Sequence, residues 1–387
     1  MNRKAKFLQA IKSLMNTKKK YKKIHTVDEL LDLPNQSLPN YKKIHNVDLS
    51  ELDLSGYENM LSGELPKQFM TPQEMAAQGI ITSWTDSVIW PTSNKLPDNI
   101  NPEKILSESK QSSEIKELHD IGRTGKGINI AIIDQRLNLN HKEYANNIKS
   151  YMVFGPWDKN GIDYHGSLVA GIAVGKTTGV APDANLYYYA APVSEITPDN
   201  KRVLSRKYAI EAIKEIIKFN KTHSDNEKIR FLSCSWGNRN DLHTKECEEL
   251  FKICEQNGIK IIGAAYKHMG TLSMDKRYGN TTANIGIPTD GKTTSFWQGG
   301  YCYTRQGGSS STFPYIAGVF ACACQGNQIF FTRPNWQEEL TTILQDTAIL
   351  TENGGKIINP IGICEKVSQI AREMEINLIK QKSLQNE

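Results

Sequence analysis

From about residue 113 onward, patterns typical of buried strands alternate with patterns typical of helices. Four apolar runs predict strands that are covered on both faces, at 128–134, 185–193, 229–235 and 260–266. Other segments have helical spacing, at 205–222, 245–258, 310–324 and 335–348. This order predicts an α/β fold with a largely parallel sheet and helices on both faces.

The sequence divides into three parts. Residues 1–112 lack the alternating pattern and are interpreted as an atypical N-terminal extension, with a short helix at 71–79 and a Pro- and Asn-rich linker at 94–104. Residues 113–368 are predicted to form the α/β domain, and residues 369–387 a helical tail. The apolar stripe of this tail is expected to pack on the body of the domain.

Basic residues are concentrated at the start of the chain. Residues 1–23 hold nine Lys or Arg and no acidic residue, so this arm carries +9, the whole chain +5 and the remainder −4. Apolar residues in the arm fall at helical spacing, which suits contact with an anionic surface or an acidic partner. A solvated or docked arm is the simpler interpretation, and we expect no nucleic-acid partner.

Cysteine usage and the lack of targeting signals favour a cytoplasmic protein. The seven cysteines form no CxxC pair, which argues against a disulfide framework or a zinc site. Buried, reduced thiols fit a reducing compartment. The first residues lack the apolar core of a signal peptide, and no run approaches the roughly 18 apolar residues of a membrane span. We expect no metal and no cofactor.

Three residues occupy positions that suit an acid, a base and a nucleophile. Asp134 ends a predicted strand, His165 precedes glycine and small residues as at a helix start, and Ser310 begins a predicted buried helix. The positive end of a helix dipole stabilises negative charge at such a serine. In this order they would form a triad in which histidine takes the serine proton and aspartate orients the imidazole.

Each of these residues also has a purely structural explanation. Asp134 could be a helix cap or a metal ligand, and His165 a core histidine with satisfied hydrogen bonds. The serines at 309–311 lie in the stretch GGSSSTFPYIAG, where small residues are common in turns and helix caps. The flanking motifs decide between these interpretations.

Those motifs resemble the subtilisin-like serine proteases (subtilases). The nucleophile motif reads GSSSTFPYIAG at 308–318, and its spacing to the proline selects Ser310. The histidine motif reads HGSLVAG from His165, and TGKG followed by an apolar strand leads to Asp134. The resemblance covers about 113–368 and implies a subtilisin-like fold and endopeptidase activity.

Further motifs in the same order strengthen this resemblance. GVAPDANLYYY from Gly179 and GKIINP at 355–360 resemble segments of the family. SWGN resembles the strand edge that lines the first specificity pocket, which implies that Ser235, Trp236 and Gly237 bind substrate. Core packing of Trp236 is an equally good explanation, because aromatic residues are mostly packing residues.

The sequence departs from the family pattern at three places. Gln135 and Arg136 follow the aspartate where the family has Thr-Gly or Ser-Gly, and the short loop from 171 to 179 implies that a calcium site of secreted members is missing. The asparagine that usually donates to the oxyanion is also missing. Three residues are candidates to replace it, namely Lys267, His268 and Asn280.

We therefore predict an intracellular serine endopeptidase with restricted protein or precursor-peptide substrates. Residues 1–112 are expected to act as a regulatory or inhibitory extension, because they lack the strand pattern of the family's prodomain. A catalytically impaired pseudoprotease that binds peptides is the first alternative. The second is a structural partner protein whose functional part is the basic arm.

Overall fold

The computed structural model describes residues 21–30, 45–60, 83–98, 100–157, 164–192, 194–197, 199, 201–236, 243–263, 285–304, 308–352 and 354–385. The chain divides into two compact units. The first comprises Met1–Ser107 with Cys302–Thr304, and the second Glu108–Tyr301 with Arg305–Glu387. The second unit contains the predicted acid, base and nucleophile.

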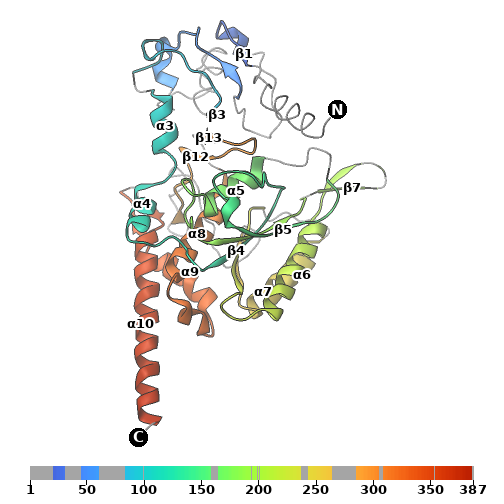
Figure 1. The fold of residues 1–387 in the computed structure, drawn as a ribbon, viewed down its shortest axis with the longest axis vertical. Coiled ribbons are helices and arrows are strands. Elements are labelled where there is room, and N and C mark those ends of the chain that lie inside the picture. Colours follow the sequence, from blue (N-terminus) through green and yellow to red (C-terminus); the bar gives the residue numbers. More distant parts are fainter. Residues whose placement is uncertain are drawn as a thin grey trace, which may run out of the picture. The chain divides into compact units, whose positions relative to one another are not determined.

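A five-stranded parallel sheet forms the centre of the second unit (Figure 1), with strand order β10-β9-β4-β6-β5. These strands are β4 (Asn129–Asp134), β5 (Ile148–Val153), β6 (Asn185–Ala190), β9 (Ile229–Cys234) and β10 (Lys260–Gly263). Every residue of β4 and β9 is buried, whereas the edge strand β5 is partly exposed. The predicted strands from 128, 185, 229 and 260 are confirmed.

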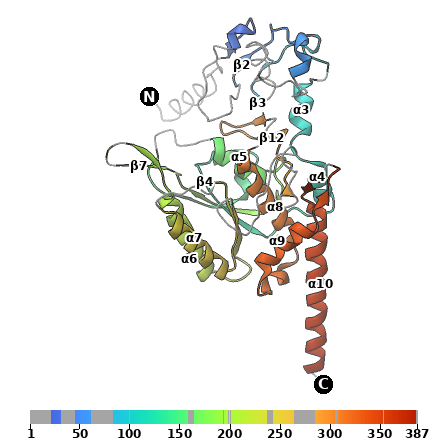
Figure 2. The same cartoon turned by 180° about the vertical axis from the view of Figure 1, so that it is seen from behind.

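Helices cover both faces of this sheet, as predicted. Ala131 and Ile133 of β4 pack with α6 (Lys207–Thr222) and α7 (Thr244–Gln256), which lie side by side in Figure 2. Ile130 and Ile132 face the opposite cluster, which includes residues of five helices. These are α4 (Ser113–Asp120), α5 (Tyr164–Val174), α8 (Thr312–Cys324), α9 (Trp336–Asp346) and α10 (Pro360–Gln385). The period of two along β4 therefore sends alternate side chains into two cores.

Helix α8 lies deepest among these helices. All thirteen of its residues are buried, and it contacts β9, β10, β4 and α5. This is why its sequence is apolar around the whole helix and not along one stripe. The short turn η6 (Ser309–Ser311) leads directly into it and carries the predicted nucleophile.

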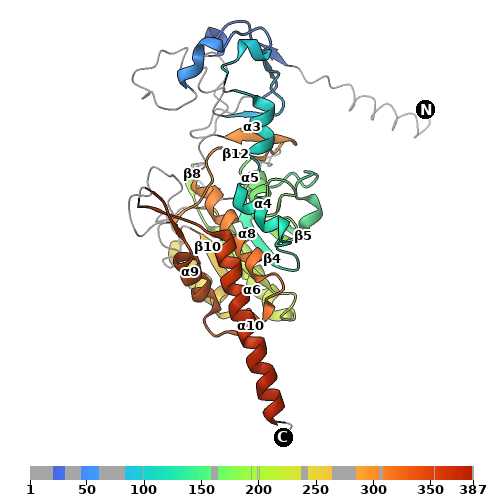
Figure 3. The same cartoon turned by 90° about the vertical axis from the view of Figure 1, so that its left-hand side faces the viewer.

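The C-terminal tail is helical but does not pack as expected. Helix α10 (Pro360–Gln385) buries Val367 and Ala371 against the second unit. Further on, Ile376, Leu378 and Ile379 are 46% to 65% exposed, and the last turns extend away from the rest of the unit (Figure 3). The prediction that the whole stripe packs on the body is wrong beyond about residue 371, because α10 is longer than the surface that it crosses.

Short strands accompany these main elements. β7 (Ser194–Ile196) and β8 (Arg202–Leu204) pair antiparallel, β12 spans Lys292–Ser295, and a small sheet joins β11 (Ile285–Gly286), β15 (Lys356–Ile357) and β14 (Ile349–Leu350). Within the described ranges, no helix combines the length and the apolar composition that crossing a bilayer requires.

The first unit has a small core of its own. β1 (Lys22–Lys23) pairs parallel with β2 (Val47–Asp48), and β3 (Ser83–Thr85) pairs antiparallel with Cys302–Thr304 of β13 (Tyr301–Thr304). Ile24, Val47, Leu49, Leu52, Leu54 and Trp84 are buried together. Turns η1 (Asp28–Leu30), η2 (Ser55–Met60) and η4 (Ser93–Lys95) and helix α3 (Pro102–Glu108) complete it.

Three predictions for the N-terminal hundred residues have different outcomes. The proposed linker at 94–104 is partly ordered, since it contains the end of η4 and the start of α3. The predicted helix at 71–79 and residues 1–20 of the basic arm lie outside the described residues. The regulatory role of residues 1–112 stays a prediction.

Candidate active site

Asp134 lies at the carboxyl end of the central strand. Its side chain is 5% exposed, and the backbone N–H of Gln135 donates to its Oδ1 at 2.7 Å. The Tyr188 hydroxyl donates to the Gln135 carbonyl at 2.5 Å, which holds the turn after the strand. Burial, together with the nearby Asp134 charge, raises the pKa of Tyr188 well above its ordinary value, so this hydroxyl stays a donor.

His165 lies in the first turn of α5 and reaches this carboxylate. Its Nδ1 is 2.7 Å from Asp134 Oδ1, and the two side chains are 20% and 5% exposed. An ionised carboxylate can only accept, so Nδ1 carries the proton of this hydrogen bond. In the neutral ring the other nitrogen, Nε2, is then an acceptor, which is the state that a general base needs.

Gly166 explains how α5 comes so close to the end of β4. A Cβ at this position would lie 2.4 Å from the Gln135 carbonyl oxygen, 2.7 Å from the Tyr188 hydroxyl and 3.1 Å from the Arg136 carbonyl oxygen. Only glycine allows this approach, because two of the three neighbouring atoms belong to the backbone. The glycine after the histidine therefore positions the Asp134–His165 pair.

Ser310 lies at the same edge of the sheet through its contact with Ser235. Its hydroxyl donates to the Ser235 carbonyl at 3.4 Å, and the Ser235 hydroxyl donates to the Ser310 carbonyl at 2.9 Å. Ser235 directly follows β9, whose last residue Cys234 pairs with Ile133, next to Asp134. Helix α5 also contacts η6. The structure thus brings the predicted acid, base and nucleophile to one edge.

The predicted substrate-binding and oxyanion residues are only partly described. Ser235 is 9% exposed, and Trp236 is partly buried against the core cluster under α6 and α7. This contact favours the packing explanation for the Trp236 ring, although its indole N–H has no hydrogen-bond partner within the described ranges. Gly237, Lys267, His268 and Asn280 all lie outside the described residues.

Glu143 is a residue that the sequence analysis missed. It is 3% exposed, and its carboxylate accepts hydrogen bonds from Thr177, Thr178 and the Tyr301 hydroxyl. Burial alone would raise the pKa of Glu143, but these hydrogen bonds lower it below its ordinary value. The carboxylate therefore holds the loop that follows α5, with partners 34 and 158 residues away in sequence.

His141 lies next to Glu143 in the same buried network of hydrogen bonds, and it makes the free energy of unfolding depend on pH. Its Nε2 donates to the Gly300 carbonyl at 3.0 Å, and its Nδ1 accepts the Glu143 N–H at 3.2 Å. The ring stacks on Tyr144, whose hydroxyl donates to Ser167 of α5. Burial lowers the pKa of His141 below its ordinary value of 6.5, so the folded protein resists a proton that the unfolded chain accepts.

We therefore expect the free energy of unfolding to fall as the pH drops below about 6.5. For this one group the slope reaches at most about 1.4 kcal/mol per pH unit. Urea unfolding at several pH values, for the wild type and for His141→Gln, measures the difference, because glutamine does not titrate. Equal slopes for the two proteins would contradict the prediction.

The cysteines and possible metal ligands complete this description. All seven cysteines are buried and lie outside disulfide bonds, and burial raises the pKa of Cys234, Cys254, Cys322, Cys324 and Cys364. Such thiols are structural and unreactive. In the part of the chain that the structure describes, no three His, Cys, Asp or Glu side chains gather in a way that would hold a metal ion.

Comparison with known proteins agrees with these motifs. Residues 125–266 match the model of the subtilase family. This segment, rather more than a third of the chain, is therefore similar to subtilases. It contains Asp134 and His165, whereas Ser310 lies beyond it.

One curated relative is the minor extracellular protease Vpr of Bacillus subtilis (strain 168). It is 30% identical over 159 residues, which are 34% of this chain. The match covers 19% of Vpr, so the chain spans about a fifth of the length of the relative that it matches.

Two solved structures also match at low identity. The prenylagaramide maturation protease PagA has a TM-score of 0.47 at 17% identity, over 66% of this chain and 99% of its own. A cold adapted subtilisin-like serine proteinase has a TM-score of 0.43 at 18% identity, over 60% of this chain and 89% of its own.

Proposed function

We propose that the chain is a serine endopeptidase that hydrolyses peptide bonds with Ser310, His165 and Asp134. The observation that carries this proposal is the 2.7 Å hydrogen bond between His165 Nδ1 and Asp134 Oδ1. It lies at the sheet edge where the Ser310 hydroxyl contacts the strand end at Ser235. A buried aspartate that orients a partly exposed histidine is the arrangement that activates a serine.

In the proposed reaction, Ser310 Oγ attacks the carbonyl carbon of the substrate while its proton moves to His165 Nε2. Asp134 stabilises the imidazolium that forms and does not take the proton itself. The imidazolium then protonates the amine of the leaving peptide as the C–N bond breaks, which leaves an acyl group on Ser310. Water repeats the sequence, with His165 as the base, and releases the acid.

The negative charge on the tetrahedral intermediate needs donors. We propose the backbone N–H of Ser310 as one of them, supported by its place directly before α8, whose dipole favours negative charge at its start. The second donor stays a prediction among Lys267, His268 and Asn280.

We further propose that the substrate lies along 235–237 as an added strand. The position of Ser235 directly after β9, with its carbonyl beside Ser310, supports this arrangement. We also propose that the substrates are restricted, such as a particular protein or precursor peptide. The seven free, buried cysteines support an intracellular, reducing compartment.

Labelling with a fluorophosphonate probe tests this function without knowledge of the substrate. We expect one adduct on the wild type by intact mass and none on Ser310→Ala, because only an activated serine reacts with the probe. Ser311→Ala is the matched control, since it removes the neighbouring hydroxyl and is expected to keep the adduct.

No adduct on correctly folded wild-type protein would contradict the proposal. The chain would then be a pseudoprotease that binds peptides at the same sheet edge. An adduct that persists on Ser310→Ala would instead assign the nucleophile to another residue.

A further inference from the structure

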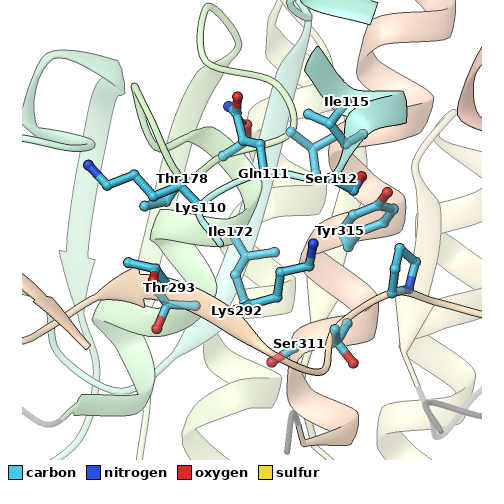
Figure 4. A pocket seen from close by; sticks show the side chains of 15 residues that line it. Lys110, Gln111, Ser112, Ile115, Ile172, Thr178, Lys292, Thr293, Ser311 and Tyr315 are labelled. Atoms are coloured by element: carbon cyan, nitrogen blue, oxygen red, sulfur yellow. Dashed lines mark hydrogen bonds between the residues drawn. The ribbon is translucent and has the colours of Figure 1, made fainter. Parts of the chain in front are cut away.

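A pocket lies beside the turn η6, which carries Ser310, because Ser311 of this turn lines it. Its cavity volume is about 30 Å³ and it opens to solvent; Figure 4 shows the side chains around it. Its walls come from the start of α4 and the segment before it, the end of α5 and the loop after it, the residues around β12 and the start of α8. Ser311, which follows the proposed nucleophile, and Tyr315, one turn later in α8, both line it. It is therefore separate from the sheet edge that holds Asp134 and His165.

Buried hydroxyl groups without partners distinguish this pocket from an ordinary surface hollow. The side-chain oxygens of Thr289, Thr293 and Thr294 have no hydrogen-bond partner in the described part of the chain. These three threonines are only 5%, 1% and 5% exposed. A buried hydroxyl left unpaired costs stability, so these hydroxyls among the lining residues favour a bound group that accepts hydrogen bonds.

The charge at the pocket favours an anion as that occupant. In Figure 4 the Lys292 side chain extends across the pocket toward Tyr315. Lys110 adds a second positive charge at the rim, although its ammonium group lies over the Tyr301 ring, 3.8 Å from the centroid. Glu114, an exposed residue of α4, feels the Lys292 charge and offsets part of it.

We propose that this pocket binds a tetrahedral oxyanion, such as a phosphate group. Threonine hydroxyls among the lining residues can donate hydrogen bonds, and Lys292 supplies the charge, which together suit an acceptor with oxygens in several directions. A flat carboxylate has only two oxygens and would leave part of this donor set unpaired. The bound group would contact Ser311 and the first turn of α8, and so would stabilise the position of the residue next to Ser310.

The test is the binding of inorganic phosphate, sulfate and acetate to the full-length protein. An oxyanion that binds only the folded state raises the melting temperature with a saturable dependence on its concentration. We expect this for phosphate or sulfate, with acetate at the same ionic strength giving no saturable shift. Isothermal titration calorimetry with phosphate then gives the dissociation constant.

Two variants locate the binding. Thr293→Val keeps the side-chain shape and removes one hydroxyl, and Lys292→Met removes the charge. Each is expected to weaken phosphate binding about 10-fold or more, the usual effect of losing one hydrogen bond to a charged group. Thr342→Val and Lys252→Met make the same changes at exposed positions of α9 and α7 and should bind as the wild type does.

The proposal is overturned if neither phosphate nor sulfate binds saturably, or if acetate alone does. It is also overturned if all four variants keep the wild-type affinity, because binding would then lie elsewhere on the protein. Lys292→Met keeps the test decisive if Thr293→Val fails to fold. None of these outcomes depends on whether Ser310 is catalytic.

Discussion

Replacing His165 with alanine is expected to lower kcat on the order of 10⁶-fold, the effect of removing the base from a Ser–His–Asp triad. Without the imidazole nothing takes the Ser310 proton, so the hydroxyl stays a weak nucleophile. Asp134→Asn is expected to cost about 10⁴-fold, because the amide would favour the wrong imidazole tautomer. The best substrate from a peptide library, assayed with each variant, measures both effects.

The double variant makes this prediction sharper. In the proposed mechanism Asp134 acts only through His165, by the hydrogen bond between Oδ1 and Nδ1. Asp134→Asn should therefore add almost nothing in the His165→Ala background, since residues that act as a unit are not additive. Asp120→Asn, an exposed aspartate at the end of α4, is the matched control and should keep wild-type activity. Additive losses in the double variant would show that the two residues act independently.

Replacing Gly166 with alanine is expected to damage both the fold and the site. The added Cβ would lie 2.4 Å from the Gln135 carbonyl oxygen and 2.7 Å from the Tyr188 hydroxyl. The carbonyl oxygen belongs to the backbone, so it can move away only if the main chain moves with it. We expect the free energy of unfolding to fall by about 3 kcal/mol, the upper range for overpacking a core. If α5 moves away to relieve the contact, His165 separates from Asp134, and a shift of about 1 Å can cost 10²-fold in rate.

Urea unfolding and the rate of fluorophosphonate labelling measure the two effects of Gly166→Ala separately. Gly56→Ala is the matched control, because nothing lies within 4 Å of a Cβ at that position. It should leave both quantities close to the wild type. If Gly166→Ala behaved like Gly56→Ala, the close approach of α5 to the end of β4 would not be what positions the histidine.

The elements that the sequence predicted well have strong local signals. β4 has four consecutive apolar residues, 130–133, before it ends in Asp134, and α8 is apolar around its whole circumference because it is buried on every side. Helix α7 ends where Gly258 adopts a left-handed φ of 70°, a conformation that glycine tolerates best. The spacing of apolar residues, the length of a segment and the glycine that ends it are local properties, so they can be recognised from neighbouring residues in the sequence.

The features that the sequence analysis missed depend on distant partners. Glu143 looks like any surface glutamate, and only the fold shows that it is buried among Thr177, Thr178 and Tyr301. His141 likewise owes its role to the Gly300 carbonyl. In α10 the apolar stripe has the same pattern before and after residue 371, yet only the first part meets a packing partner.

By itself the sequence determined the α/β class of this protein, the main strands and helices, and the motifs around Asp134, His165 and Ser310. Only the tertiary structure decided that His165 Nδ1 lies 2.7 Å from Asp134, and that the Ser310 hydroxyl contacts the carbonyl of Ser235. The physical reason is that periodicity reports which faces are buried, whereas a distance depends on how separate segments pack. Gly166 illustrates both, because the sequence shows that the residue has no Cβ, whereas only the packing of α5 against the end of β4 shows why a Cβ would not fit there.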